Sequence, residues 1–126
     1  MSQRILLVDD EPDIVAVMKI GLEKNGFQVD AFNDPVEALS HFKVDYYDLV
    51  LLDIKMPKMT GFDLSREIVK LDNKSKVCFM TAFEVNMKEA QALFPTLKMD
   101  GFLKKPLATS EIVKVLNDIL KTTTAR

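Results

Sequence analysis

The chain has 126 residues, of which 48% are hydrophobic, so it is long enough for one domain with its own core. Its 17 basic and 19 acidic side chains give a formal charge of −2, which argues against direct binding of nucleic acid through phosphates. No apolar run approaches the roughly 18 residues that span a bilayer, and the single cysteine, Cys78, lies in an apolar run, as expected in a reducing compartment. We therefore expect a single soluble, cytoplasmic domain over residues 1–126, with its core over about 4–120 and a polar tail over 121–126.

Short apolar runs alternate with amphipathic segments from the first residues onward, which is typical of a parallel sheet with helices on its faces. Residues 5–8 form a continuous apolar run and predict a strand buried on both sides. A helix follows from Pro12 to the residues before Gly26, with Ile14, Met18 and Leu22 on its apolar stripe. Alternation over residues 27–31 predicts a second strand near the sheet edge, and Asp34 begins a second helix with Leu39 and Phe42 facing inward.

The same alternation continues to the end of the chain. Strands are predicted at residues 49–52, 77–80 and 101–104, and the first of these ends on Asp53. A third helix is marked by Leu64, Ile68 and Leu71, a fourth covers about 84–94, and the last begins at Thr109 with a stripe of Ile112, Leu116 and Ile119. The chain is thus predicted to have an α/β fold with five strands and five helices.

Acidic residues follow two of the predicted buried strands. In open α/β sheets, ligands bind beyond the carboxyl ends of the strands, where Asp9, Asp10 and Asp53 are expected. Three carboxylates in one place repel one another unless a cation compensates their charge. Oxygen ligands without nearby histidine or cysteine favour Mg²⁺, or Mn²⁺, over zinc, and Mg²⁺ keeps waters that a phosphoryl group can replace. The pattern therefore indicates a divalent metal site for phosphoryl chemistry.

Asp53 is the best candidate for a nucleophile, because it stands alone at the end of the most apolar strand. The pair Asp9 and Asp10 suits metal binding, although an aspartate here can also serve only as a helix cap, and Asp53 only as a turn residue. The hydroxyl of Thr81 and an ammonium from Lys104 or Lys105 are candidate donors to the phosphoryl oxygens. Their joint placement at strand ends favours the catalytic interpretation.

Four motifs in order resemble the receiver domains of two-component response regulators, including the chemotaxis-regulator type. They are LVDDEPD, LLDIKMPKMTG, MTA and FLKKPL, and the resemblance runs from about residue 4 to residue 120. It implies a flavodoxin-like (βα)5 fold whose parallel sheet has the strand order 2-1-3-4-5. Asp53 would then accept a phosphoryl group from a histidine kinase or phosphotransfer protein, with Asp10 bound directly to Mg²⁺ and Asp9 acting through water.

The resemblance also implies roles for the residues around Asp53. The backbone carbonyl of Lys55 would complete the metal ligands, and the lysine that holds the phosphate falls on Lys105, next to Pro106, in a peptide bond that can be cis. Thr81 would move toward the phosphate while Phe102, where many members have tyrosine, turns inward. Such a protein is a signalling switch that catalyses only its own phosphorylation and dephosphorylation, and it acts on a downstream protein, on its own output domain or through a phosphorylation-dependent dimer.

Several positions depart from the family pattern. Lys98 and Met99 stand where small residues are usual, and Pro95 interrupts the preceding helix, which predicts an unusual partner surface. Phe83 and Lys55 flank the phosphate position, where the bulky ring of Phe83 would shield an acyl phosphate from water. We therefore expect slow self-dephosphorylation.

Three other functions share parts of this pattern. A haloacid-dehalogenase-type phosphatase requires a second aspartate two residues after the first, where this chain has Lys55. A flavodoxin-like nucleotide binder requires glycine or hydroxyl residues in the first turn, which here is acidic. The third is a receiver-like docking module that works by constitutive protein contacts without phosphorylation, and intact residues at the key positions argue against it.

Overall fold

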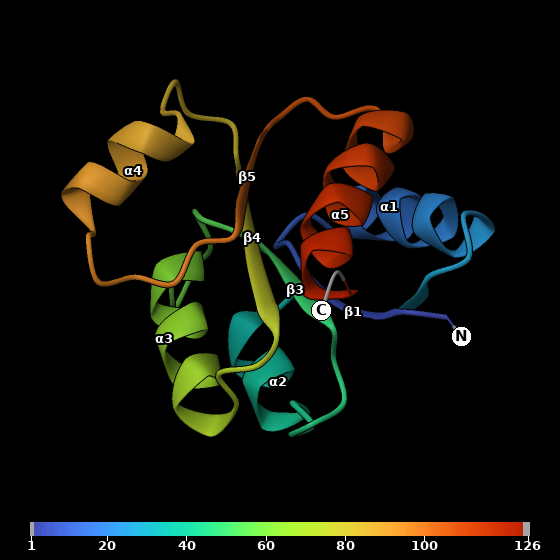
Figure 1. Cartoon of the computed structure of the whole chain (residues 1–126), viewed down its shortest axis with the longest axis horizontal. Coiled ribbons are helices and arrows are strands. Elements are labelled where there is room, and N and C mark those ends of the chain that lie inside the picture. The colour runs from blue at the N-terminus through green and yellow to red at the C-terminus, as the bar shows by residue number, and fades with distance from the viewer. Residues whose placement is uncertain (1, 125–126) are drawn as a thin grey trace.

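Five strands and five helices alternate along the computed structural model, which describes residues 2–124 (Figure 1). In chain order they are β1 (Arg4–Val8), α1 (Pro12–Lys24), β2 (Gln28–Phe32), α2 (Pro35–Ser40), β3 (Leu49–Asp53), α3 (Gly61–Leu71), β4 (Lys76–Thr81), α4 (Met87–Leu93), β5 (Gly101–Lys104) and α5 (Thr109–Thr124). All strand pairs are parallel, and the order across the sheet is β2-β1-β3-β4-β5. The predicted flavodoxin-like fold is confirmed.

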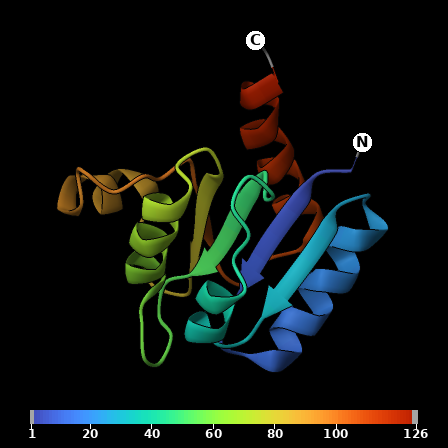
Figure 2. The ribbon, with the colours of Figure 1, turned by 90° about the horizontal axis from the view of Figure 1, so that it is seen from below.

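Helices cover both faces of the sheet. Side chains alternate along a strand, so Ile5 and Leu7 of β1 lie in the core under α1 and α5, whereas Leu6 and Val8 lie under α2, α3 and α4. Figure 1 shows these two groups of helices on opposite sides of the strands. Figure 2 shows the arrowheads of β1, β2 and β3 pointing toward one edge of the sheet. Residues that follow these strands therefore gather at that edge.

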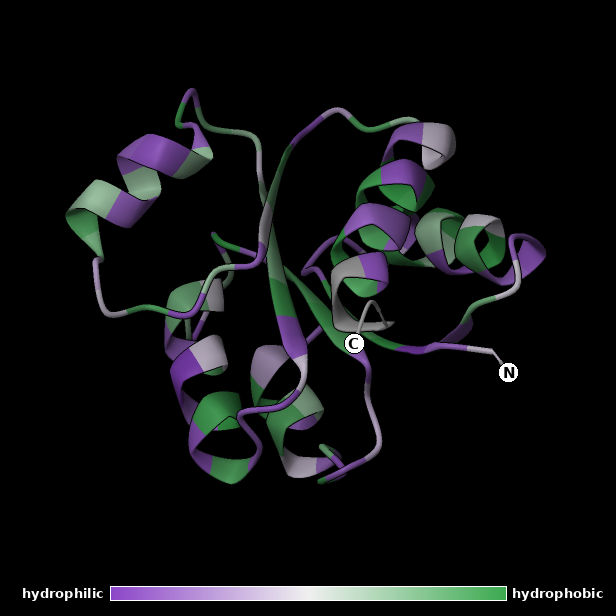
Figure 3. Cartoon of the chain, in the orientation of Figure 1, coloured by the Kyte–Doolittle hydropathy of each residue, from purple (hydrophilic) through white to green (hydrophobic). Residues whose placement is uncertain are grey.

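The central strands are the most apolar part of the molecule. Every residue of β3 is buried, including Asp53, and Ile5, Leu6, Leu7 and Val8 of β1 have no exposed surface. Figure 3 shows the middle of the sheet mostly in hydrophobic colours, while the helices alternate between hydrophobic and hydrophilic bands. Among the residues that the structure describes, no helix combines the length and the apolar character that crossing a membrane requires.

The buried faces of three helices differ in register from the predicted stripes. In α1 the core residue of the first turn is Val15 rather than Ile14, which is 37% exposed. Leu71, at the end of α3, is 52% exposed because the helix ends there. In α5 the third core residue is Leu120, with Ile119 only partly buried. The stripes of α1 and α5 are thus each wrong by one residue at one position, whereas the stripe of α3 is correct at Leu64 and Ile68 and extends one residue too far.

Three helix ends also differ from the prediction. α2 ends at Ser40, so Phe42, which was predicted on its inward face, lies beyond the helix and is partly buried. α4 begins at Met87 rather than near residue 84, because Asn86 and Glu89 form a reciprocal capping box: Asn86 Oδ1 accepts from the Glu89 amide at 2.8 Å, and Glu89 Oε1 from the Asn86 amide at 3.4 Å. α5 continues to Thr124, so the first part of the predicted polar tail is helical. Residues 125 and 126 of that tail lie outside the described residues.

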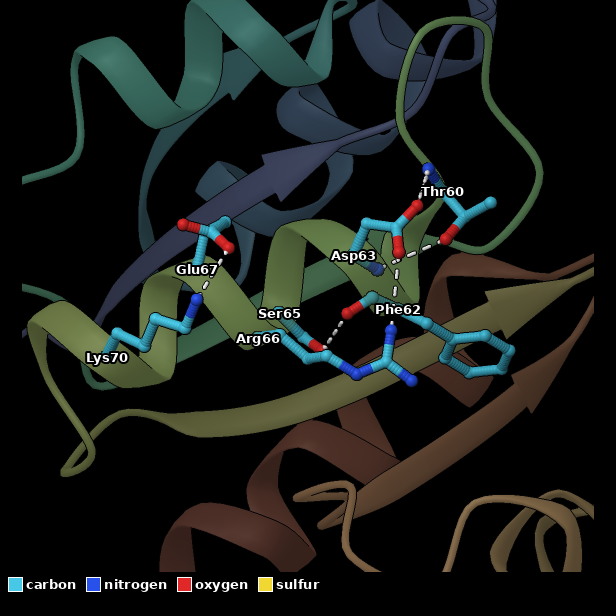
Figure 4. Close-up of polar contacts among 7 residues, drawn as sticks. All are labelled: Thr60, Phe62, Asp63, Ser65, Arg66, Glu67 and Lys70. Carbon is cyan, nitrogen blue, oxygen red and sulfur yellow. Dashed lines mark hydrogen bonds and ion pairs between the residues drawn. The ribbon is translucent and has the colours of Figure 1, made fainter.

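The loop after β3 is closed by the start of α3. Thr60 Oγ1 accepts a hydrogen bond from the Asp63 amide at 3.1 Å, and Asp63 Oδ2 accepts one from the Thr60 amide at 3.2 Å (Figure 4). Gly61, the first residue of α3, lies directly against the backbone of Asp53, where a Cβ atom would overlap the carbonyl oxygen of Asp53. The glycine therefore permits the close approach that fixes α3 beside the end of β3.

Candidate functional site

Three carboxylates meet at the edge of the sheet toward which the strands point. β1 and β3 are neighbours in register, Val8 beside Leu52, so Asp9 and Asp10 follow one strand next to Asp53 on the other. One oxygen from each of the three lies within 4.8 Å of the others. Asp9 has no exposed surface, and Asp53 is 6% exposed. The structure thus brings together the three acidic residues that the sequence places at strand ends.

Among the described residues, one ammonium group, that of Lys105, lies among these carboxylates. Lys105 Nζ is 2.5 Å from Asp9 Oδ2, 3.5 Å from Asp53 Oδ2 and 3.6 Å from Glu11 Oε1. Burial alone lowers the pKa of Lys105, but contact with Asp9 and the charges of the surrounding carboxylates outweigh it, so the net pKa is raised. Lys104 instead pairs with Glu84 at the exposed surface. The structure therefore brings Lys105, and not Lys104, to the acidic cluster, and the Lys105–Pro106 peptide bond is cis.

One lysine does not balance the charge of this site. Burial, followed by the negative charges of Asp9 and Asp10, raises the pKa of Asp53 from its ordinary value of 3.8 to about 7, although Lys105 opposes the shift. The ionised form of Asp53 is therefore costly in the protein without a metal. A further cation at the cluster would lower that cost.

The ligand atoms fit a hard divalent cation. Asp9 Oδ1 accepts a hydrogen bond from the Glu11 amide at 3.0 Å. The other oxygen, Asp9 Oδ2, is buried, and no described residue donates a hydrogen bond to it. Lys105 forms an ion pair with Oδ2, but outside hydrogen-bond geometry. A buried carboxylate oxygen whose charge is met only by the Lys105 ammonium is suited to a metal ion or its bound water. All three side chains offer oxygen, the donor that Mg²⁺ prefers.

Thr81 ends β4 beside this cluster and is 1% exposed. Its hydroxyl oxygen accepts from the Phe83 amide at 3.1 Å, which leaves the hydroxyl proton free to be donated to another group. The backbone carbonyl of Thr81 accepts from the Lys105 amide at 2.7 Å. The ends of β4 and β5 are thus tied together, and Thr81 and Lys105 are held on the same side of the site.

A cleft of about 560 Å³ opens over the acidic cluster. Its lining residues are Asp10, Glu11, Asp53, Lys55, Met56, Pro57, Thr81, Ala82, Phe83 and Lys105. Lys55 Nζ lies 5.5 Å from the centroid of the Phe83 ring, and both side chains are exposed at the rim of the cleft. Phe102 is not among the lining residues; it is half-buried and packs with the core under α2, α3 and α4.

Sequence reasoning missed two contributors to this site. Glu11 lines the cleft and pairs with Lys105, although the sequence shows it only as the residue after the acidic pair. Gly61 lies against the backbone of Asp53, and its place at the end of the loop after β3 is the only signal that the sequence carries. Neither contact follows from residue spacing, because each depends on how a loop folds back over a strand end.

Comparison with known proteins identifies relatives along nearly the whole chain. Residues 5–117 match the family of response regulator receiver domains. The chain is 31% identical over 118 residues to the transcriptional regulatory protein TrcR of Mycobacterium tuberculosis, and 37% identical over 112 residues to the aerobic respiration control sensor protein ArcB of Escherichia coli. These alignments cover 94% and 89% of this chain, but only 45% of TrcR and 14% of ArcB. The chain thus spans less than half the length of these relatives.

Two solved structures of response regulator proteins are also similar to this chain. A response regulator receiver domain protein from Methanospirillum hungatei is 25% identical, with a TM-score of 0.86 over 97% of this chain and 96% of that one. The response regulator protein TrrA from Thermotoga maritima, in complex with Mg²⁺ and BeF, is 29% identical, with a TM-score of 0.77 over 93% of this chain and 98% of that one.

Proposed function

We propose that this chain, which belongs to the response regulator receiver domain family of two-component systems, is a switch operated by phosphorylation of Asp53. Receiver domains are signalling switches, and the finer assignment rests on one observation. The buried carboxylate of Asp53 lies within a cluster of carboxylates, 3.5 Å from the Lys105 ammonium, at the base of an open cleft. This arrangement provides a nucleophile, a cationic group and access for a phosphoryl donor.

Receiver domains bind Mg²⁺ at such an acidic pocket, and Asp10, Asp53 and the backbone carbonyl of Lys55 would hold the ion here, with Asp9 acting through water. When bound, Mg²⁺ neutralises charge on the carboxylates and on the transferring phosphoryl group. Mn²⁺, which prefers the same oxygen ligands, should substitute for it. The free, buried Cys78 fits a reducing compartment, in keeping with a cytoplasmic switch.

The residues of the chain can carry out the transfer. A carboxylate oxygen of Asp53 attacks the phosphorus of a phosphohistidine on a kinase or phosphotransfer protein, the P–O bond forms, and the P–N bond breaks with its electron pair going to the histidine nitrogen. Lys105 pairs with a phosphoryl oxygen, and the hydroxyl proton of Thr81 is donated to another. Water later attacks the phosphorus, which releases inorganic phosphate and restores the Asp53 carboxylate.

The same groups would convert phosphorylation into a change of surface. The Thr81 hydroxyl would give up the hydrogen bond that it accepts from the Phe83 amide and donate one to the phosphate. Half-buried Phe102 would turn inward as the neighbouring loop adjusts. A downstream protein, an attached output domain or a second copy of the chain would recognise the altered face. Phe102 acts in this scheme by packing alone, because it lacks the hydroxyl of tyrosine.

Incubation with Mg²⁺ and acetyl phosphate, followed by intact-protein mass spectrometry, tests this proposal. Wild type should gain the mass of one phosphoryl group, whereas Asp53→Asn and wild type in EDTA should not. If wild type gains no mass, or if Asp53→Asn gains as much as wild type, the alternative of a docking module that works by constitutive contacts takes its place.

A further inference from the structure

The ammonium of Lys105 lies among the carboxylates that would hold a metal ion. Lys105 Nζ is 2.5 Å from Asp9 Oδ2, a buried oxygen to which no described residue donates a hydrogen bond. A divalent cation shared by Asp9, Asp10 and Asp53 would lie within a few ångströms of the ammonium, and like charges at that distance in a buried site repel strongly. Metal binding therefore requires Lys105 to move away from Asp9.

Glu11 is the acceptor that remains for the displaced ammonium. Among the described residues, Lys105 forms ion pairs with three carboxylates, and two of them, Asp9 and Asp53, belong to the metal cluster. The third, Glu11, is 3.6 Å away, outside the cluster, and its side chain is 62% exposed and so has room to adjust. A short movement toward Glu11 would keep Lys105 paired and still beside the cleft.

The local structure gives Glu11 no other polar role among the described contacts. Glu11 is the N-cap residue of α1, a position where side chains commonly accept a hydrogen bond from the first turn, but its side chain makes no such bond. Its backbone amide instead donates to Asp9 Oδ1, which fixes Glu11 next to the metal cluster. The carboxylate is thus held near Lys105 by the backbone and is not used as a cap.

We propose that Glu11 is a positioning residue that receives the Lys105 ammonium when a divalent cation binds Asp9, Asp10 and Asp53, and that it thereby strengthens metal binding. Glu11 touches neither the cation nor the phosphoryl group in this role, and it acts through Lys105. The inference rests on the metal-binding part of the proposed function and is independent of whether Asp53 becomes phosphorylated.

Titration calorimetry with Mg²⁺ on four proteins tests the proposal: wild type, Glu11→Gln, Lys105→Gln and the double variant. Glu11→Gln should weaken Mg²⁺ binding about three- to fivefold, the size expected for one partly exposed ion pair. In the Lys105→Gln background the same change should alter affinity by less than about twofold, because the ammonium that Glu11 receives is gone. Lys105→Met repeats the comparison if Lys105→Gln does not fold.

Glu84→Gln is the matched control. Glu84 and Glu11 both line a second groove, next to the cleft over the acidic cluster, but Glu84 pairs with Lys104 rather than with Lys105. The Mg²⁺ affinity of Glu84→Gln should equal that of wild type. Equal losses from Glu11→Gln with and without Lys105 would overturn the proposal in favour of a direct or long-range attraction of the metal. Unchanged affinity in Glu11→Gln, or no Mg²⁺ binding by wild type, would also overturn it, whereas a failure of phosphorylation with this binding pattern intact would count against the proposed function alone.

Discussion

At the scale of single residues, the site is defined by negative charge that one lysine does not neutralise. Asp53 is buried beside Asp9 and Asp10, and burial and their negative charges raise its pKa to about 7, so ionising it without a metal is costly. The proton is therefore bound more tightly in the folded protein than in the unfolded chain, where the pKa is near 3.8. Stability of the metal-free protein should fall as the pH rises between these two values.

Asp53→Asn should accordingly stabilise the protein in EDTA. The advantage should grow from about pH 4 to pH 7 and then level off, with an upper limit of about 4 kcal/mol from three pKa units. Urea unfolding of both proteins at several pH values measures it. Added Mg²⁺ should narrow the difference by stabilising wild type more than the variant. A variant no more stable than wild type at pH 8 in EDTA would contradict this account of the site.

Phe83 should slow the loss of phosphate from Asp53. Its ring is 48% exposed at the rim of the cleft, with the Lys55 ammonium 5.5 Å from its centroid, so the two side chains can shield an acyl phosphate from water. Phe83→Ala should lose phosphate several-fold faster than wild type when decay is followed by intact mass. Leu93→Ala, which removes an exposed hydrophobic residue that does not line the cleft, is the control. Faster decay in wild type than in Phe83→Ala would show that the ring does not shield.

The sequence predicts the acidic residues of the site for a physical reason. Parallel strands end at one edge, so Asp9, Asp10 and Asp53 had to meet if residues 5–8 and 49–52 form neighbouring strands. Spacing alone did not separate Lys104 from Lys105, because both follow the last strand, and only the resemblance favoured Lys105. The pairing of Glu11 with Lys105 depends on the path of a loop, which no periodicity reports.

At the scale of elements, the β3–α3 connection is what fixes Asp53. Gly61 N donates to the Ile54 carbonyl at 2.8 Å. The capping box of Thr60 and Asp63 makes Thr60 the N-cap residue, so α3 begins at Gly61. The sequence shows a loop here but not this contact, since a glycine in a loop fits many conformations. The start of α4 was predicted too early for a similar reason. Several polar residues near residue 84 could begin a helix, and the sequence does not show that Asn86 and Glu89 form the capping box.

Gly61→Ala should destabilise the protein and weaken Mg²⁺ binding together. The new Cβ would overlap the carbonyl oxygen of Asp53, so the backbone that carries the carboxylate must shift, at a typical cost of about 1–3 kcal/mol. Gly26→Ala is the comparison: Gly26 has a φ of 92° but open space around it, so it should lose stability through backbone strain without any change in Mg²⁺ affinity. Urea unfolding and calorimetry measure both properties, and normal Mg²⁺ binding by Gly61→Ala would contradict the positional role of Gly61.

An unusual pair of residues, Lys98 and Met99, is accommodated by the α4–β5 connection. Lys98 Nζ donates to the carbonyls of Asn73 and Ser75 at 2.6 and 2.7 Å, and Met99 is buried under the helices of that face. The lysine thus satisfies carbonyl groups of the α3–β4 loop rather than extending into solvent. This connection is anchored at the opposite edge of the sheet from Asp53, at the start of β4.

At the scale of the whole molecule, helices cover both faces of the sheet, and the core on each face is buried. The sequence predicted this architecture well, because buried strands appear in it as continuous apolar runs and amphipathic helices as apolar residues three or four positions apart. The exact helix faces were predicted less well, because a shift of one residue, as from Ile14 to Val15, changes an amphipathic pattern only slightly. Tertiary packing then decides which neighbour is buried.

The reactivity of the Cys78 thiol reports whether the core stays closed. Cys78 has no exposed surface in the middle of β4, and burial followed by the charge of Asp100 raises the pKa of its thiol to about 12. The thiolate is therefore scarce at pH 8, and reaction with a thiol reagent should require opening of the sheet. Labelling should be at least a thousandfold slower in buffer than in urea, as the unfolding equilibrium of a stable domain implies. Rapid labelling under native conditions would contradict the buried position of Cys78.

Phosphorylation of this switch should take place on Asp53 itself. After incubation with Mg²⁺ and acetyl phosphate, borohydride reduces an aspartyl phosphate to an alcohol, and peptide mass mapping locates the reduced residue. We expect reduction at Asp53 alone, and none at Asp9, at Asp10 or in samples treated with EDTA. Reduction at another aspartate, or none in a wild-type sample that binds Mg²⁺, would contradict it.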